Sequence, residues 1–145
     1  MWIDRLLSSK VTNGIELSAR FAEERQRVLA VNVANIHTPD YQTRRLDLQS
    51  FQASLREALR MSSAKDGHRL KLRGNAQFST TPSGRTEVRP AIDPAQNILF
   101  HDGTNARIER MMSDAAKNAL QYQFMTTLLG GRYDGLLNAI RGRTA

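Results

Sequence analysis

Residues 102–141 read DGTNARIERMMSDAAKNALQYQFMTTLLGGRYDGLLNAIR, and this stretch decides the fold. It contains no proline, and no glycine interrupts it between Gly103 and the Gly130-Gly131 pair. Apolar residues recur at steps of three and four, which places them on one side of an α-helix because 3.6 residues complete a turn. Such a helix would extend roughly 55 Å, more than the width of a compact domain of this size, so it needs a long partner. The apolar positions are Ile108, Met111, Met112, Ala115, Ala119, Tyr122, Met125, Leu129, Tyr133, Leu136, Leu137 and Ile140.

A second helical pattern, in residues 15–35, supplies a candidate partner. Its apolar positions also follow steps of four and three, and charged residues at 23–27 flank them as the solvated positions of a coiled coil do. The pattern stops before Thr38-Pro39, because the residue before a proline is disfavoured in a helix. We therefore predict that the two terminal helices pair, in either parallel or antiparallel orientation. The predicted seam consists of Leu17, Phe21, Val28, Val31, Ile108, Ala115, Met125, Leu129, Leu136 and Ile140.

Between the two long helices, the sequence changes in character. An amphipathic pattern predicts a short helix at about residues 47–61. From residue 62 to 100 the helical period disappears, and glycine or proline recurs every few residues. Residues 69–73, Arg-Leu-Lys-Leu-Arg, alternate between cationic and apolar, so the two leucines share one strand face. This region is too poor in apolar residues for an independent sheet domain, and we expect an extended segment with one β-hairpin at most.

The predicted fold class is mainly α. Long N- and C-terminal helices pair as a coiled-coil-like hairpin, and a short third helix and an extended loop or β-hairpin lie between them. The chain divides into residues 1–36, 37–101 and 102–145. A break in the first helix is expected near Gly14, since Asn-Gly is a turn or helix-stop signal.

Ahead of that signal, residues 1–12 carry a short amphipathic pattern: Trp2, Ile3, Leu6, Leu7 and Val11. Two interpretations stay open. The apolar face docks on another subunit or a membrane-associated partner, or it packs on its own chain. The acid at position 4 and the lack of a long apolar run argue against a cleaved secretory signal. No stretch approaches the ~18 apolar residues of a membrane span.

The 145-residue chain has a formal net charge of +7, and residues 37–101 carry ten basic and six acidic groups. Arg69, Lys71 and Arg73 would lie on one strand face, where cations can track a phosphate backbone. A basic nucleic-acid-binding module is therefore an alternative. No aromatic residue is interleaved for base stacking, so an acidic neighbouring subunit is favoured as the partner of these cations.

The sequence contains no motif for catalysis or for a cofactor. His37, His68 and His101 are single and far apart, without the spacing of metal ligands. The chain has no phosphate-binding glycine loop and no nucleophile motif. It also has no cysteine, which removes disulfides, thiolate nucleophiles and cysteine-type zinc sites. We expect a protein that is not an enzyme and that holds no metal or cofactor.

Residues 32–41, NVANIHTPDY, resemble the amino-terminal signature of bacterial flagellar axial proteins, which reads approximately A-x-N-[IL]-A-N-x-x-T-P-G-Y. Asp40 stands where that signature has glycine, and aspartate tolerates left-handed backbone geometry better than most residues. The matching residues are Asn32, Ala34, Asn35, Thr38, Pro39 and Tyr41.

The second half of the resemblance lies in the C-terminal stretch. Residues 102–105, DGTN, are similar to the D-G-N-N segment that introduces the C-terminal helix in that family, and residues 118–123 resemble the N-x-L-x-Y-Q core of that helix in its proximal rod members. The resemblance covers about residues 1–60 and 100–143. The residues that carry it here are Asp102, Gly103, Asn105, Glu109, Asn118, Leu120 and Tyr122.

This resemblance implies a structural subunit of the flagellar basal-body rod. It implies a helical assembly of many copies, with the terminal helices forming an inner tube around the export channel. Implied partners are other copies, other rod proteins, the rod adaptor protein, the MS-ring protein and the flagellar type III export gate. The implied location is the periplasmic rod, reached without a cleaved signal peptide. Another rod protein of the same family remains an alternative.

Three asparagines of the signature segments, Asn32, Asn35 and Asn118, have two interpretations. A polar group on an otherwise apolar seam fixes the register of paired helices. Alternatively, each is a capping or solvated residue.

Overall fold

The computed structural model of the protein describes residues 10–62, 70, 72–80, 86–93 and 108–142. Within them, the chain forms three helices and two small two-stranded sheets. Long terminal helices with a short third helix and a small hairpin between them confirm the predicted fold class. In chain order, the elements are α2 (Lys10–Ala34), β1 (Arg44–Arg45), α3 (Leu48–Met61), β2 (Phe78–Thr80), β3 (Thr86–Val88), β4 (Ala91–Ile92) and α4 (Ile108–Ile140).

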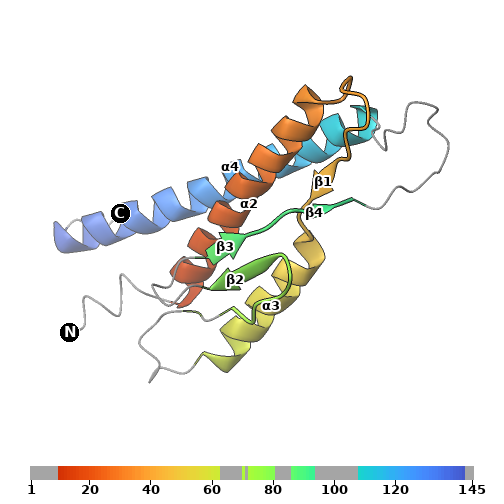
Figure 1. The fold of residues 1–145 in the computed structure, drawn as a ribbon. Coiled ribbons are helices and arrows are strands. Elements are labelled where there is room, and N and C mark those ends of the chain that lie inside the picture. The colour runs from red at the N-terminus through yellow and green to blue at the C-terminus, as the bar shows by residue number, and fades with distance from the viewer. Residues whose placement is uncertain (1–9, 63–69, 71, 81–85, 94–107, 143–145) are drawn as a thin grey trace.

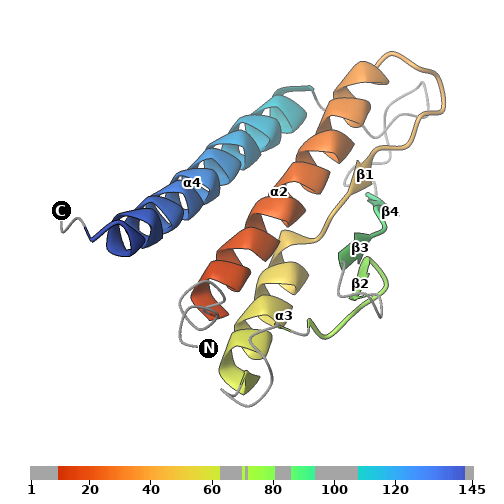
Figure 2. The ribbon, with the colours of Figure 1, turned by 90° about the vertical axis from the view of Figure 1, so that its left-hand side faces the viewer.

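The central element is α2. It packs against α4 on one side and against α3 and the strands on the other (Figures 1 and 2). The two long helices run antiparallel, which settles the orientation that the sequence left open. With 33 residues in α4 and 25 in α2, their lengths are about 50 and 38 Å. The longer helix therefore cannot be covered along its whole length by the shorter one.

The hydrophobic core lies between α2, α3 and the middle segment. This segment comprises the described residues of 37–101 outside α3. The rings of Phe21 and Phe51 stack at a centroid distance of 4.0 Å, and Phe78 meets Phe51 edge-on at 5.9 Å. Such aromatic pairs add about 0.5–1.5 kcal/mol to the burial of their area. The buried members of the core are Phe21, Leu46, Phe51, Ala58, Leu70, Leu72 and Phe78.

This core contains residues that the sequence analysis placed on the seam with the C-terminal helix. Phe21 is at its centre, Leu17 and Val28 pack against it, and Val31 is 48% exposed. A helix between two layers has two apolar sides, and the 3.6-residue period alone does not say which side meets which layer. The largest side chains of α2 face α3 and the middle segment.

The middle segment forms two antiparallel ladders, one more than the single hairpin expected from the sequence. β2 and β3 form the expected antiparallel hairpin, with Phe78 opposite Val88. A second antiparallel ladder joins β1 to β4, with Arg44 opposite Ile92. The sequence analysis did not predict this second ladder, because two-residue strands far apart in the chain leave no periodic signal.

In the alternating segment around residue 70, the two leucines are buried together as predicted, but the described residues 70 and 72–75 form no strand. Leu70 and Leu72 are both buried in the core, and Arg73 is exposed. Arg69 and Lys71 lie outside the described residues, so their predicted strand face is not described. The hydroxyl of Ser54 donates to the carbonyl of Arg73 at 3.1 Å, which ties this segment to α3.

The predicted break near Gly14 is absent, and α2 is continuous through Asn13 and Gly14. Gly14 is buried against α3, where a Cβ built on it would lie 3.5 Å from Leu59 Cδ2 and 3.7 Å from Leu70 Cδ1. Packing therefore overrides the intrinsic cost of a glycine in a helix, which is about 1 kcal/mol relative to alanine.

Replacing Gly14 by alanine should stabilise the protein. The distances from the added methyl group are those of ordinary van der Waals contact, so the helix gains propensity without a clash. We expect the free energy of unfolding, measured by urea titration, to rise by about 0.5–1 kcal/mol. Gly14→Leu is the control: it overfills the same site and should lose stability. A loss in the alanine variant would contradict this packing.

The third helix begins at a well-formed N-cap. Asp47 Oδ1 accepts hydrogen bonds from the backbone N–H groups of Gln49 (2.9 Å) and Ser50 (3.1 Å). The Ser50 hydroxyl donates to Asp47 Oδ2 at 2.5 Å. This hydroxyl, the two N–H groups and the nearby charge of Arg45 lower the pKa of Asp47, against an opposing effect of burial.

The Asp47 cap should make the fold sensitive to acid. Because the pKa is lower in the folded chain, the charged cap stabilises the fold above the unfolded pKa of about 4 and loses this effect as pH falls through the folded pKa. Asp47→Ala should cost about 1 kcal/mol at pH 7 and less at pH 2.5, as measured by urea unfolding. Ser50→Ala should raise the Asp47 pKa measured by NMR. A cost of Asp47→Ala that is equal at both pH values would contradict this account.

Candidate assembly surfaces

The seam between α2 and α4 is built around one buried amide, Asn118, which is 1% exposed. Its Nδ2 donates to the carbonyl oxygen of Ala22 and to Oε1 of Gln26, both at 2.8 Å. Its Oδ1 accepts from Nη1 of Arg25 at 3.3 Å. The donors and the acceptor of the side chain are therefore all paired across the seam. Sliding α4 by one turn would leave this buried amide without these partners, at a cost of about 1–3 kcal/mol.

On α2, small residues let α4 approach closely at this point. Ala22 is 2% exposed, and Ala19 and Leu29 are buried at spacings of three and seven from it, on the same side of the helix. None of these three residues belongs to the hydrophobic core. The helix pair is thus held by alanines, Leu29 and polar groups, and Phe21 of α2 is used in the hydrophobic core.

The predicted seam positions of α4 divide into two groups. Ala115, Met125, Leu129 and Leu136 are half-buried, on the side of the helix that carries Asn118. Ile108 and Ile140, at the two ends of the helix, are 40% and 68% exposed. Met111 is the one fully buried apolar residue among the described residues of α4.

The partners of Asn118 on α2 were not predicted. Gln26 and Arg25 look in the sequence like flanking charged or polar positions. Gln26 could have been identified as a partner from its spacing, because it lies one turn after Ala22 on the same side of the helix. A polar residue one turn after a small buried one can meet an amide of the facing helix.

The second buried asparagine, Asn32, joins the end of α2 to β1. It is 3% exposed, and its amide exchanges two hydrogen bonds with the backbone of Arg44: Nδ2 donates to the carbonyl at 2.6 Å, and Oδ1 accepts from the N–H at 3.0 Å. The hydroxyl of Tyr41 donates to the same Oδ1 at 3.0 Å. The side chain thus pairs with β1 as a neighbouring strand would.

The remaining residues of the N-terminal signature form the turn between the end of α2 and β1. Asn35 Nδ2 donates to the carbonyl of Val31 at 2.8 Å, and the N–H of Thr38 donates to the carbonyl of Asn35 at 3.0 Å. Asp40 has a φ of 58°, in the left-handed region that favours the glycine of the family signature. Ala34, Thr38 and Pro39 are exposed.

The C-terminal signature residues do not converge on one point. Glu109 lies in the first turn of α4, where a carboxylate is favoured by the helix dipole. Leu120 and Tyr122 are 68% and 40% exposed, while Asn118 between α2 and α4 is buried. Asp102, Gly103 and Asn105 lie outside the described residues.

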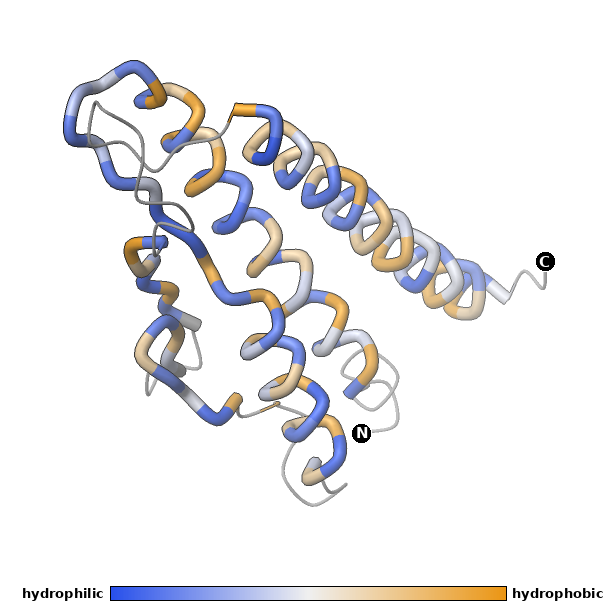
Figure 3. Tube along the Cα trace, turned by 90° about the vertical axis from the view of Figure 1, so that its right-hand side faces the viewer, coloured by the Kyte–Doolittle hydropathy of each residue, from blue (hydrophilic) through white to orange (hydrophobic). Residues whose placement is uncertain are grey.

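A large apolar face of α4 is uncovered. Leu120, Phe124 and Leu128 follow one another at one-turn spacing, on a side of the helix that does not face α2. Apolar residues recur along the whole of α4 in Figure 3. Isolated exposed apolar residues are common, but three large apolar side chains in a row on one side of a helix mark a candidate interaction site. The exposed large apolar residues of α4 are Ile108, Met112, Leu120, Tyr122, Phe124, Leu128, Tyr133, Leu137 and Ile140.

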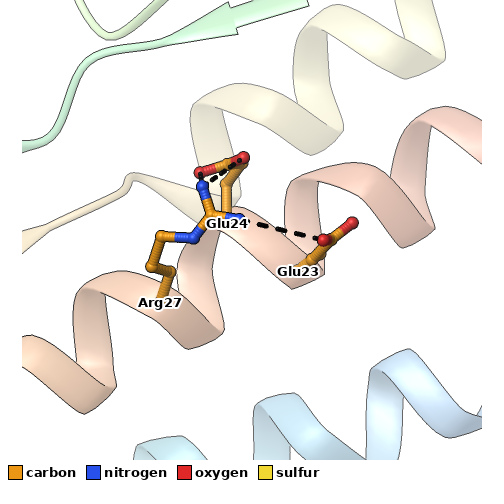
Figure 4. A network of polar contacts seen from close by, with 3 residues as sticks. All are labelled: Glu23, Glu24 and Arg27. Carbon is orange, nitrogen blue, oxygen red and sulfur yellow. Dashed lines mark hydrogen bonds and ion pairs between the residues drawn. The ribbon is translucent and has the colours of Figure 1, made fainter.

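The outward surface of α2 is instead charged. Arg27 pairs with Glu23 at 3.9 Å and with Glu24 at 3.2 Å (Figure 4), and Arg20 pairs with Glu16 at 2.6 Å. Ion pairs within one exposed helix contribute about 0.3–0.5 kcal/mol each. These charges keep the surface solvated.

Within the described part of the chain, no group of three or more His, Cys, Asp or Glu residues is placed to hold a metal ion. The helices described there also include none that is long and apolar enough to cross a membrane. His37 is exposed, whereas His68 and His101 lie outside the described residues.

No protein-family model matches the chain. It is similar to curated proteins that carry the name flagellar basal body rod protein FlgB. It is 30% identical to that of Escherichia coli over 139 residues, which cover 88% of this chain and 95% of the relative. It is 27% identical to that of Salmonella typhimurium over 142 residues (88% and 96%) and 26% identical to that of Bacillus subtilis over 137 residues (94% and 97%).

Removing the Asn118 amide should weaken the seam. Asn118→Ala deletes three hydrogen bonds across it, so we expect the free energy of unfolding to fall by about 1–3 kcal/mol in urea titrations. Asn138→Ala, at an exposed asparagine of the same helix, is the matched control and should change stability by less than about 0.5 kcal/mol. Equal effects of the two substitutions would show that the amide does not hold the helices together.

Proposed function

The chain belongs to the FlgB family of flagellar basal body rod proteins, and we propose that it polymerises helically through its terminal helices to form the proximal part of the rod. The observation that carries this proposal is the apolar face of α4 that α2 leaves uncovered. A structural subunit needs such a face, whereas a monomeric protein would be stabilised by hiding it.

Covering the exposed face of Leu120, Phe124 and Leu128 would favour association. Burying a side chain such as leucine or phenylalanine contributes about 1.5–3 kcal/mol. Association costs an estimated 4–15 kcal/mol in lost freedom of motion. Leu120, Phe124 and Leu128 are 39–68% exposed, so covering them contributes about half of this burial energy per side chain and offsets part of that cost.

The two outward helix surfaces favour an open, helical assembly. The free side of α4 carries Leu120, Phe124 and Leu128, whereas the paired charges of α2 stay solvated, so the α4 face would pack on a different surface of the next copy. Contacts between two unlike surfaces are heterologous, and they continue from copy to copy unless the rotation closes a ring. Each added copy then presents a new free surface to the next.

The composition of α4 makes it dependent on such neighbours. Gly130, Gly131 and Gly135 lie in its C-terminal half, and a Cβ on any of them would have nothing within 4 Å. Each glycine weakens an exposed helix by about 1 kcal/mol relative to alanine. This half of the helix therefore draws stability from contacts beyond α2, and assembly and ordering of the chain would be coupled.

The proposed location, export route and partners are those that the family resemblance implies. The subunit would form part of the drive shaft around the export channel, in the periplasm, after export through the flagellar type III gate without a cleaved signal peptide. Its partners would be other rod proteins, the rod adaptor protein and the MS-ring protein. It would act as a structural component and not as an enzyme.

The basic residues of the middle segment do not favour the nucleic-acid alternative. Arg45 pairs with Asp93 at 3.2 Å, and Arg89 pairs with Glu87 at 3.5 Å. These cations are engaged within the chain, so less of the positive charge is free to follow a phosphate backbone.

A charge placed on the α4 face should separate folding from assembly. Phe124 is 59% exposed, so Phe124→Asp should change the free energy of unfolding of the monomer by less than about 1 kcal/mol. The same change should prevent self-association in sedimentation velocity and should abolish motility in a complementation assay, because a buried carboxylate without a partner is costly.

The matched control for this experiment is Gln52→Asp, which adds a charge at an exposed position of α3. It should leave both self-association and motility intact. Normal rods and full motility with Phe124→Asp would show that this face is not an assembly surface.

A further inference from the structure

A groove with a volume of about 200 Å³ lies between α2 and the strands of the middle segment. Val28 and Val31 of α2 form one wall, and Val88 and Pro90 form the other. Val31 is 48% exposed, so an apolar surface faces solvent inside the groove. The groove lies on the opposite side of α2 from the seam with α4, and the assembly surface proposed above does not include it.

The charged residues around the groove differ in their pairing. Glu24 and Arg27 both line it and bind one another at 3.2 Å (Figure 4). Arg44 also lines it, and the hydrogen bonds that this residue makes within the described chain come from its backbone. The Arg44 guanidinium is thus a cation without a described partner, beside an apolar surface. Such a site suits a segment with one carboxylate among apolar side chains.

The N-terminal segment of this chain has that composition. Residues 2–7 read Trp-Ile-Asp-Arg-Leu-Leu, with Asp4 as the single acid among four apolar residues. The sequence analysis left open whether this segment docks on another subunit. The arginine that follows Asp4 can face the acidic side of the groove at Glu24.

The segment of the same chain can approach Arg44 only in a fully extended form. Asn32, which binds the backbone of Arg44, is 22 residues after Lys10, or about 33 Å along α2. Asp4 precedes Lys10 by six residues, which span at most about 21 Å when fully extended. For Asp4 of the same chain to meet Arg44, all six residues would have to be fully extended, against the amphipathic helical pattern of residues 1–12, so we assign the carboxylate to another copy.

We propose that residues 2–7 of one copy dock into this groove of a neighbouring copy, with Asp4 bound to Arg44 and the side chains of Trp2 and Ile3 against Val31 and Val88. The inference rests on the proposed assembly of copies, and it adds a second contact to the α4 face. In this arrangement, each copy would hold its neighbour at two separate surfaces.

Disulfide cross-linking tests this contact directly, because the natural chain contains no cysteine. Full-length Ile3→Cys and Val31→Cys proteins are purified separately, mixed and oxidised, so every mixed disulfide joins two copies. We expect the mixed disulfide to form at least fivefold faster than with Ala53→Cys, an exposed position of α3 outside the groove. Equal rates at Val31 and Ala53 would overturn the proposal.

A charge exchange tests the pairing itself. Arg44→Asp in the Val31→Cys protein should slow the mixed disulfide severalfold, and Asp4→Arg in the Ile3→Cys protein should restore it. No slowing, or slowing without restoration, would overturn the Asp4–Arg44 contact. The Phe124→Asp experiment tests assembly separately: if it abolishes assembly while the cross-link fails, the docking is wrong and the proposed function stands.

Discussion

The structure depends on the burial of α2 on two sides. An apolar core covers one side, and a seam with a buried amide covers the other. Two consecutive residues show this: Phe21 stacks on Phe51 of α3, and the carbonyl of Ala22 accepts a hydrogen bond from Asn118 of α4. The first side is an ordinary apolar core with aromatic rings at its centre. The second is a narrow seam of alanines and aliphatic side chains around one fully paired amide. The first side stabilises the fold through its buried apolar area, and the second side fixes where α4 lies along α2.

This division is consistent with the proposed role of α4 in assembly. A helix held through one narrow seam keeps most of its circumference free, and in α4 the free part includes the row Leu120, Phe124 and Leu128. α2, α3 and the strands bury their large side chains in a core of their own, so they do not need α4 to cover them. α4 can therefore present its free face to other copies while the rest of the chain stays folded.

Long periodic elements were predictable from the sequence, and their partners were not. The third helix was expected at about residues 47–61 and is found at Leu48–Met61 with Asp47 as its cap. Phe21 was expected to face the C-terminal helix and packs on Phe51 instead, because periodicity identifies an apolar side without identifying what covers it. The buried contacts of Asn118 with Gln26 and of Asn32 with Arg44 depend on tertiary distances, which sequence spacing does not encode. Gly14 shows the reverse case, in which a strong local stop signal is overridden by packing on Leu59.

The central claim is that α4 is held to α2 of its own chain at Asn118 and is covered by neighbouring copies on its free face. The most direct measurement is electron cryo-microscopy of intact basal bodies, at a resolution that traces this subunit. The account predicts that Asn118 stays against Ala22 of the same chain, and that Leu120, Phe124 and Leu128 lie against another subunit. A rod in which these three side chains face an open channel, or in which α4 leaves its own α2, would contradict it.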